Sequence, residues 1–166
     1  MFLYLVQHAE AKKEEEDKER PLSEHGLKDI TRMAEYASHL NIKLDSIYHS
    51  TKLRAKQTAQ ILFEYLKPIK GLTETTGLSP MDAPEIWHAR LKETDENIML
   101  VGHLPHLARL SSLLLTGNAE KIIISFKMAG IVCFKRSDEN LWSLQWMLTP
   151  EIILSEGRAV NSCDSL

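Results

Sequence analysis

The chain has 166 residues, of which 43% are hydrophobic and 26% charged, a composition typical of a soluble globular protein with one buried core. The net charge of -3 argues against a polyanion-binding protein, so we expect no nucleic-acid partner and only a local basic site. No apolar run approaches the roughly 20 residues of a membrane span, and no basic region precedes the first apolar residues. Cys133 and Cys163 form neither a disulfide framework nor a zinc pattern, which favours the cytoplasm.

The first quarter of the chain contains a strand, a charged loop and a helix. Residues 2–6 are a continuous apolar run, as in strands buried on both faces of a parallel sheet. Residues 11–19 are dense in both charges and indicate a surface loop. Ser23 is a suitable N-cap, and apolar residues then recur at helical spacing to Leu40. We therefore predict an amphipathic helix over 23–40.

The remainder alternates between apolar strands and helical patterns. A strand over 46–49 leads to a helix that Ser50 or Thr51 caps and Pro68 ends. The later elements are a short strand at 72–75, a helix from Pro84, a buried strand at 97–101 and a helix over 105–117 that Pro105 begins. We predict that the last two strands, 128–134 and 141–148, form an antiparallel pair.

This alternation predicts an α/β fold, a three-layer sandwich in which helices flank a mostly parallel central sheet. We expect one domain over residues 1–154 without an inserted lid, followed by a flexible polar tail over 155–166. The sequence contains no internal repeat and no glycine-rich phosphate loop.

Three histidines, His8, His49 and His103, follow or end predicted strands. If these strands are parallel, the histidines share one edge of the sheet, where α/β proteins bind ligands. Arg54 falls in the first turn of a predicted helix, whose free N–H groups also favour anions. Imidazoles, a guanidinium and helix N-termini suit a tetrahedral oxyanion, on which one imidazole could act as a nucleophile. A zinc site of the three histidines is the alternative, although no carboxylate motif supports it.

Four sequence elements resemble the histidine phosphatase superfamily, and specifically its small SixA-type phosphohistidine phosphatases. The elements, in order, are Gln7-His8-Ala9, the segment Arg20 to Gly26, the segment Ser50 to Ala59, and Val101 to Pro105. Their order and spacing make the match specific, and the resemblance extends over about residues 1–150. It implies a phosphoglycerate-mutase-like fold.

The resemblance also implies the roles of individual residues. His8 would be the nucleophile that becomes phosphorylated, and Arg54 and His103 would bind the phosphoryl oxygens, with Arg20 as a further contact at the mouth of the pocket. Gln7 stands where the family usually has a phosphate-binding arginine, and its amide can donate hydrogen bonds without a charge. Losing one charge-assisted contact would weaken phosphate binding by about 1.5–3 kcal/mol. No cofactor or metal is implied.

The sequence shows no convincing general acid: Glu74 and Asp82 lie in the corresponding region but in no clear motif. A missing acid favours a phosphoramidate, whose imidazole leaves readily. We therefore expect a metal-independent phosphohistidine phosphatase that acts on a phosphohistidine-containing protein, such as a phosphotransfer domain. The alternatives are a phosphatase of small phosphate esters, or a weakly active module that binds phosphate or phosphoprotein because of Gln7. Phosphate and sulfate are the expected anions, and no membrane contact is expected.

Overall fold

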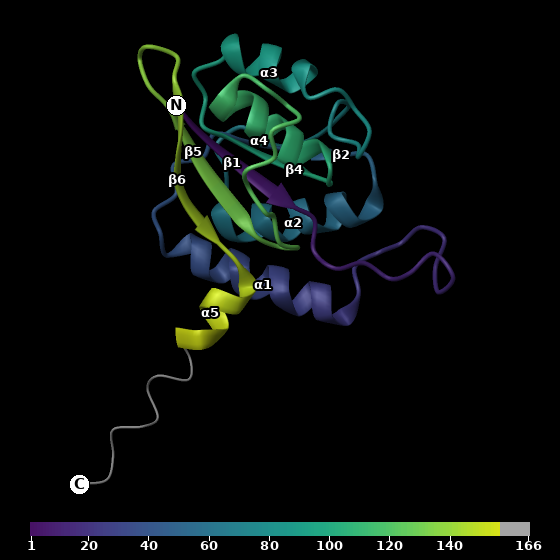
Figure 1. The fold of residues 1–166 in the computed structure, drawn as a ribbon. Helices are drawn as coiled ribbons and strands as arrows, with labels where there is room; N and C mark the ends of the chain where they lie inside the picture. The colour runs from purple at the N-terminus through teal and green to yellow at the C-terminus, as the bar shows by residue number, and fades with distance from the viewer. Residues whose placement is uncertain (157–166) are drawn as a thin grey trace, which may run out of the picture.

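The protein folds around one six-stranded sheet, seen in a computed structural model that describes residues 1–156 (Figure 1). The strand order is β3-β2-β4-β1-β5-β6. The first four strands in this order are parallel, β5 pairs antiparallel with β1, and β6 pairs antiparallel with β5. The strands are β1 (Phe2–Gln7), β2 (Ser46–Ser50), β3 (Gly71–Thr75), β4 (Ile98–Gly102), β5 (Ile131–Arg136) and β6 (Trp142–Leu148).

Helices cover both faces of this sheet, which completes the predicted three-layer α/β sandwich (Figure 1). One layer contains α1 and α2, with α5 packed against α1, and the other contains α3 and α4. The helices are α1 (Glu24–Ser38), α2 (Leu53–Leu66), α3 (Glu85–Lys92), α4 (His106–Thr116) and α5 (Pro150–Glu156). None of the helices within residues 1–156 is long and apolar enough to cross a membrane.

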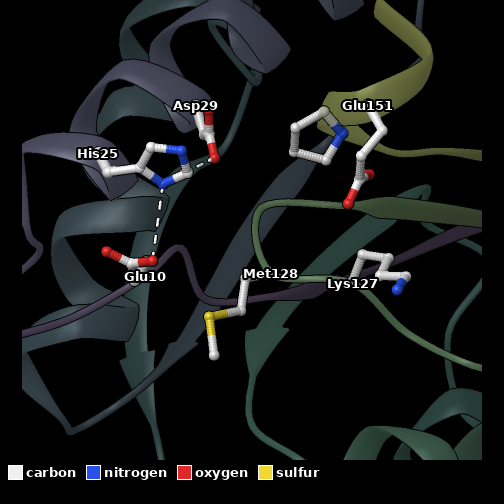
Figure 2. Close-up of a pocket in the computed structure, with 7 residues that line it drawn as sticks. Glu10, His25, Asp29, Lys127, Met128 and Glu151 are labelled. Carbon is white, nitrogen blue, oxygen red and sulfur yellow. Dashed lines mark ion pairs between the residues drawn. The ribbon is translucent and has the colours of Figure 1, made fainter.

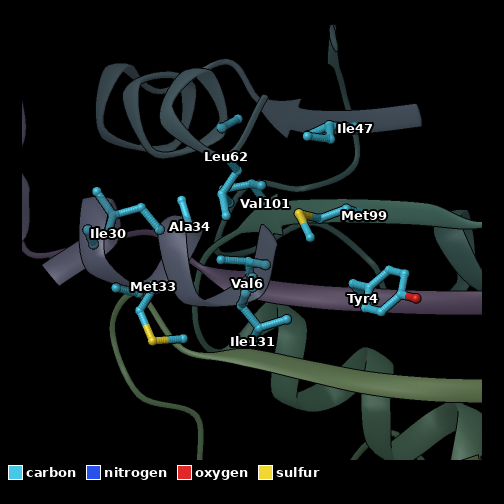
Figure 3. Packing of buried hydrophobic residues seen from close by; sticks show 14 of the residues in the cluster. Tyr4, Val6, Ile30, Met33, Ala34, Ile47, Leu62, Met99, Val101 and Ile131 are labelled. Carbon is cyan, nitrogen blue, oxygen red and sulfur yellow. The ribbon is translucent and has the colours of Figure 1, made fainter. Parts of the chain in front are cut away.

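Alternating side chains of β1 supply both halves of the core. Tyr4 and Val6 pack in the cluster beneath α1 and α2, which Figure 3 shows with Ile30 and Met33 of α1. Leu3 and Leu5 belong to the opposite cluster, which contains residues of α3 and α4. Successive side chains of a strand point to opposite faces, so an apolar run without alternation identifies a strand buried on both sides.

The pairing of β1 with β4 brings two distant segments to one edge of the sheet. Their parallel register pairs Val6 with Val101 and Gln7 with Gly102. The backbone continues this pairing one residue further, because the His8 N–H donates to the Gly102 carbonyl over 3.0 Å. His8 and His103 therefore follow directly after neighbouring strand ends, as the strand-end pattern predicts.

The start of α1 holds the loop that follows β1. Ser23 caps the helix by accepting a hydrogen bond from the Gly26 N–H, as predicted, and its hydroxyl also donates to Glu10 over 2.6 Å. The Ser23 N–H donates to the Glu10 carbonyl over 2.9 Å. A β-carbon on Gly26 would lie only 2.1 Å from this carbonyl oxygen. The glycine is thus required by a close backbone approach.

Several element ends differ from the sequence expectation. Lys52 occupies the N-cap position of α2, and neither Ser50 nor Thr51 caps it, because Ser50 ends β2 as a buried residue that contacts His103. Pro105 is the N-cap of α4 and precedes its first helical residue. β5 begins at Ile131, after a turn in which Ala129 has a φ of 61°.

The C-terminal boundary also differs. Residues 155 and 156, which the sequence analysis placed in a flexible tail, belong to α5. The remainder of that predicted tail, 157–166, lies outside the described residues.

We predict that Gly26→Ala destabilises the protein, because the added carbon meets backbone that cannot move independently of the His8 loop. Overpacking of this kind costs about 1–3 kcal/mol. Urea denaturation measures the difference from wild type. Lys28→Ala, an exposed substitution in the same helix, is the control and should change stability little. A Gly26→Ala variant as stable as this control would show that the contact is not restrictive.

Candidate functional site

The His8 side chain is held in one tautomer. The residue is 9% exposed, and its Nδ1 lies 2.7 Å from the Ala9 carbonyl oxygen, which can only accept a hydrogen bond. Nδ1 therefore carries the proton. The Arg54 Nε–H donates to Nε2 over 3.2 Å, so the lone pair of His8 lies on Nε2. Nε2 is the nitrogen available to attack a substrate.

His103 lies beside His8. The two imidazole rings have centroids 4.8 Å apart and are tilted by 56°. His103 is 1% exposed, and its Nε2 is 3.0 Å from the Ser50 hydroxyl. Its Nδ1 is buried and has no hydrogen-bond partner among residues 1–156. Two imidazoles from neighbouring strand ends thus form one cluster.

Arg54 reaches this cluster from the first turn of α2. Thr58, one turn further along α2, joins the helix to the His8 loop. Its hydroxyl donates to the Arg54 carbonyl over 2.7 Å and accepts from the Ala9 N–H over 3.0 Å. The carbonyl of the same residue, Ala9, accepts the hydrogen bond from Nδ1 of His8. Thr58 therefore helps to orient the histidine.

Burial and nearby cations keep both imidazoles neutral. Burial, partly opposed by the bond to Ala9, and the positive charges of Arg54 and Arg20 lower the pKa of His8 to about 4. Burial is also the main reason that the pKa of His103 falls to about 3, with further contributions from His8, Arg54 and Lys52. A charged imidazole is penalised in such an environment. At neutral pH, His8 is consequently a neutral imidazole with a proton on Nδ1 and a lone pair on Nε2.

A polar cavity of about 370 Å³ adjoins Arg54. Four cationic side chains and two carboxylates are among the residues that line it: Lys18, Arg20, Lys52, Arg54, Glu14 and Glu19. The charged segment 11–19 therefore contributes to this cavity in addition to forming an exposed loop. Arg20 adopts a positive φ of 51°, and its side chain donates to the Lys12 carbonyl over 3.3 Å. The positive charge of Arg20 lowers the pKa of both His8 and Arg54, which agrees with a position of Arg20 near the mouth of the cluster.

Gln7 immediately precedes His8 in the chain. In the register of β1 and β4 it pairs with Gly102, the residue that precedes His103. The residue is 8% exposed, and its Oε1 is buried without a hydrogen-bond partner in the described part of the chain. Its backbone carbonyl accepts a hydrogen bond from the Ala129 N–H over 3.0 Å. The structure thus places the five predicted site residues around one edge of the sheet: Gln7, His8, Arg20, Arg54 and His103. At position 7 it has a neutral amide where the family resemblance implies a cation.

Comparison with known families agrees with this geometry. The sequence model of the histidine phosphatase superfamily (branch 1) matches residues 3–99, which is more than half of the chain. The chain belongs to the histidine phosphatase superfamily. The matched region contains His8 and Arg54 and ends shortly before His103. None of the curated proteins searched matches the chain.

Solved structures of this superfamily share the fold at low sequence identity. The protein histidine phosphatase SixA, complexed with tungstate, is 21% identical, with a TM-score of 0.81 over 92% of this chain and 99% of SixA. A phosphohistidine phosphatase SixA assigned in Agrobacterium tumefaciens is 23% identical, with a TM-score of 0.74 over 90% and 97% of the two chains. The mycobacterial glucosyl-3-phosphoglycerate phosphatase, complexed with VO3, is 17% identical, with a TM-score of 0.71 over 87% and 97%.

Within residues 1–156 of this histidine phosphatase superfamily member, neither Glu74 nor Asp82 forms a hydrogen bond or ion pair with the histidine cluster or with Arg54. Glu74 is exposed on β3, which lies at the edge of the sheet. The Asp82 carboxylate accepts a hydrogen bond from the Ser79 N–H over 2.8 Å, which occupies it within its own turn. The Asp82 carbonyl accepts from Nδ1 of His106, a fully buried residue that the sequence pattern did not single out.

His49 does not join His8 and His103. It lies within β2 rather than after it, and its Nδ1 donates to the Ser50 carbonyl over 2.9 Å. Within residues 1–156, no group of three or more His, Cys, Asp or Glu side chains is arranged to hold a metal ion. The zinc alternative of the sequence analysis finds no geometric support in this part of the chain.

A second cavity, of about 300 Å³, lies beside α1 and α5 and is chemically different (Figure 2). His25 there pairs with Glu10 at 3.6 Å and with Asp29 at 3.3 Å. Glu151 adds a third carboxylate, opposite Lys127. Three carboxylates disfavour a phosphoryl group, so this cavity is a poor candidate for the phosphate site.

The pKa shift of His8 predicts a dependence of stability on pH. The unfolded chain takes up a proton near the ordinary histidine pKa of about 6.5, whereas folded His8 does so only near 4. Stability should therefore fall as pH decreases from about 6.5 to 4, with a contribution from His8 on the order of 3 kcal/mol. Urea unfolding at several pH values between about 4 and 6.5 measures this change in the free energy of unfolding. The free energy of unfolding of His8→Asn should change less steeply with pH than that of wild type. Equal pH dependence of the two proteins would contradict the lowered pKa of His8.

Proposed function

We propose that this protein is a metal-independent phosphohistidine protein phosphatase that acts through a covalent phosphohistidine at His8. The observation that carries the proposal is the fixed tautomer of His8, whose Nε2 lone pair faces Arg54 beside His103. A neutral imidazole with a defined lone pair is a competent nucleophile for phosphorus, and cationic side chains can supply the charge that phosphoryl transfer needs.

The reaction has two displacements. His8 Nε2 attacks the phosphorus atom in line on a substrate whose imidazole is protonated on its other ring nitrogen. The bond from phosphorus to the substrate nitrogen breaks, and its electron pair returns to the ring, which leaves as neutral imidazole. A water molecule then attacks the same phosphorus, and the bond to Nε2 breaks, which restores the neutral imidazole and releases inorganic phosphate. Arg54 and His103 would bind the equatorial oxygens, with the Gln7 amide and Arg20 as further contacts.

The engaged state of Asp82 and the exposed position of Glu74 support a phosphoramidate substrate. The imidazole of a phosphohistidine that is protonated on its other ring nitrogen leaves as a neutral group and needs no acid from the protein, whereas an alkoxide requires proton donation. The cavity beside Arg54 is lined by four cations against two carboxylates, and this excess of positive charge suits an acidic partner protein such as a phosphotransfer domain.

The nucleophile can be tested directly. Incubation with a ³²P-labelled phosphohistidine protein should label the wild type with acid-labile, base-stable phosphate, and His8→Ala should show neither label nor turnover. His39→Ala, which removes an exposed histidine at the end of α1, is the control and should behave as wild type. Undiminished turnover by His8→Ala would falsify the assignment.

The substrate class needs a separate test, since the superfamily also contains phosphatases of small molecules, such as the mycobacterial glucosyl-3-phosphoglycerate phosphatase. We expect kcat/KM for a phosphohistidine protein to exceed that for a panel of small phosphate esters. A clear preference for one of the esters would replace the protein substrate by a metabolite.

Gln7 supports a further alternative, a module that binds phosphoprotein with little turnover, because its amide is neutral and its buried oxygen lacks a partner in the described chain. Gln7→Arg should raise kcat/KM about tenfold or more, since a charge-assisted hydrogen bond contributes about 1.5–3 kcal/mol. Gln60→Arg, which adds the same charge at an exposed position on α2, is the matched control. Unchanged activity of Gln7→Arg would show that the pocket already has sufficient positive charge, and wild-type binding without turnover would favour the module.

A further inference from the structure

A buried hydroxyl lies behind the second histidine. Ser50 is the last residue of β2 and is 1% exposed. Its Oγ is 3.0 Å from Nε2 of His103 and 3.5 Å from the backbone nitrogen of Lys52. The Lys52 N–H can only donate, so it occupies one lone pair of the hydroxyl oxygen, and the hydroxyl proton remains available for the imidazole.

The protonation of His103 gives this contact a chemical consequence. His103 is neutral at pH 7, since burial and the neighbouring positive charges lower its pKa to about 3. A neutral imidazole has a single N–H. Nδ1 is the buried nitrogen without a partner in the described residues, while Nε2 is engaged by Ser50. His103 can donate to a phosphoryl oxygen only if its single proton is on Nδ1.

We propose that Ser50 is a positioning residue that holds His103 in the Nδ1–H tautomer. The chain of donors runs from the Lys52 N–H to Ser50 Oγ, from the Ser50 O–H to His103 Nε2, and from His103 Nδ1–H to the phosphoryl group. If bound phosphate draws a second proton onto the imidazole, the same hydroxyl can rotate and accept from Nε2–H. Nδ1 thus presents a donor in both charge states. The inference rests on the proposed function for its last step.

An ordinary structural hydroxyl would be arranged differently, and the protein contains one for comparison. Ser111 in α4 is also fully buried, but its hydroxyl donates to the Ala108 carbonyl over 2.9 Å within its own helix. That bond only satisfies the serine, as is common in helices. The Ser50 hydroxyl instead bonds to the side chain of His103, which follows β4 at the sheet edge where the two histidines meet.

The test compares Ser50→Ala, Ser50→Thr and the control Ser111→Ala. Losing the fixed Nδ1–H donor to the charged phosphoryl group should lower kcat for phosphohistidine hydrolysis about tenfold in Ser50→Ala, with a smaller change in KM. Ser50→Thr retains the hydroxyl and should recover most of the activity. Ser111→Ala should match wild type, and thermal unfolding checks that each variant is folded. Ser50→Cys keeps the shape of the side chain with a weak donor and replaces the alanine variant if that variant does not fold.

A second readout does not depend on activity. ¹⁵N NMR of histidine-labelled protein, with and without inorganic phosphate, reports which nitrogen of His103 carries the proton, and comparison with His103→Asn assigns the signal. We expect Nδ1–H in wild type and Ser50→Thr, and a shift toward Nε2–H in Ser50→Ala.

The two readouts separate the proposals. A tautomer shift in Ser50→Ala, with no phosphohistidine hydrolysis by wild type, would uphold the positioning role and reject the proposed function. An active wild type whose Ser50→Ala variant keeps both the Nδ1–H tautomer and full turnover would overturn the role of Ser50 and leave the proposed function standing.

Discussion

The parallel pairing of β1 with β4 is the constraint on which the site depends. Residues about 95 positions apart in the chain become neighbours because Gln7 is in register with Gly102. The His8 N–H then bonds to the Gly102 carbonyl, and the next side chains of both strands meet with ring centroids 4.8 Å apart. The register is itself set by burial, since a slip of one residue would turn Leu3, Leu5 and their neighbours to the wrong helical layer.

Burial also determines the chemistry of the histidines. The same packing that removes them from water keeps them neutral, so their proton positions depend on neighbouring acceptors and donors. His8 is fixed by the Ala9 carbonyl, which Thr58 holds through the Ala9 N–H. The arrangement directs the Nε2 lone pair of His8 toward Arg54, and no carboxylate within residues 1–156 bonds to the imidazole.

The fold followed from the sequence more completely than the site did. The double burial of β1, the Ser23 cap and the alternation of elements were local patterns, and the superfamily assignment rests on motifs whose order could be read directly. Local patterns could not show that Ser50 contacts His103 instead of capping α2, or that His106 is fully buried. These outcomes depend on which segments pack together, and a residue type alone carries no information about a partner 50 positions away.

By itself, the sequence determined the α/β class, the sheet-edge placement of His8 and His103, and the absence of an arginine at position 7, because periodicity and residue identity are properties of the chain. Only the tertiary structure decided the tautomer of His8 and the isolation of the Gln7 oxygen from any partner among the described residues. It also decided which of three histidines meet: His49 lies inside β2 and is bonded to its own neighbour. The physical reason is that hydrogen bonds and desolvation act across short distances in space, and those distances exist only once the strands have paired.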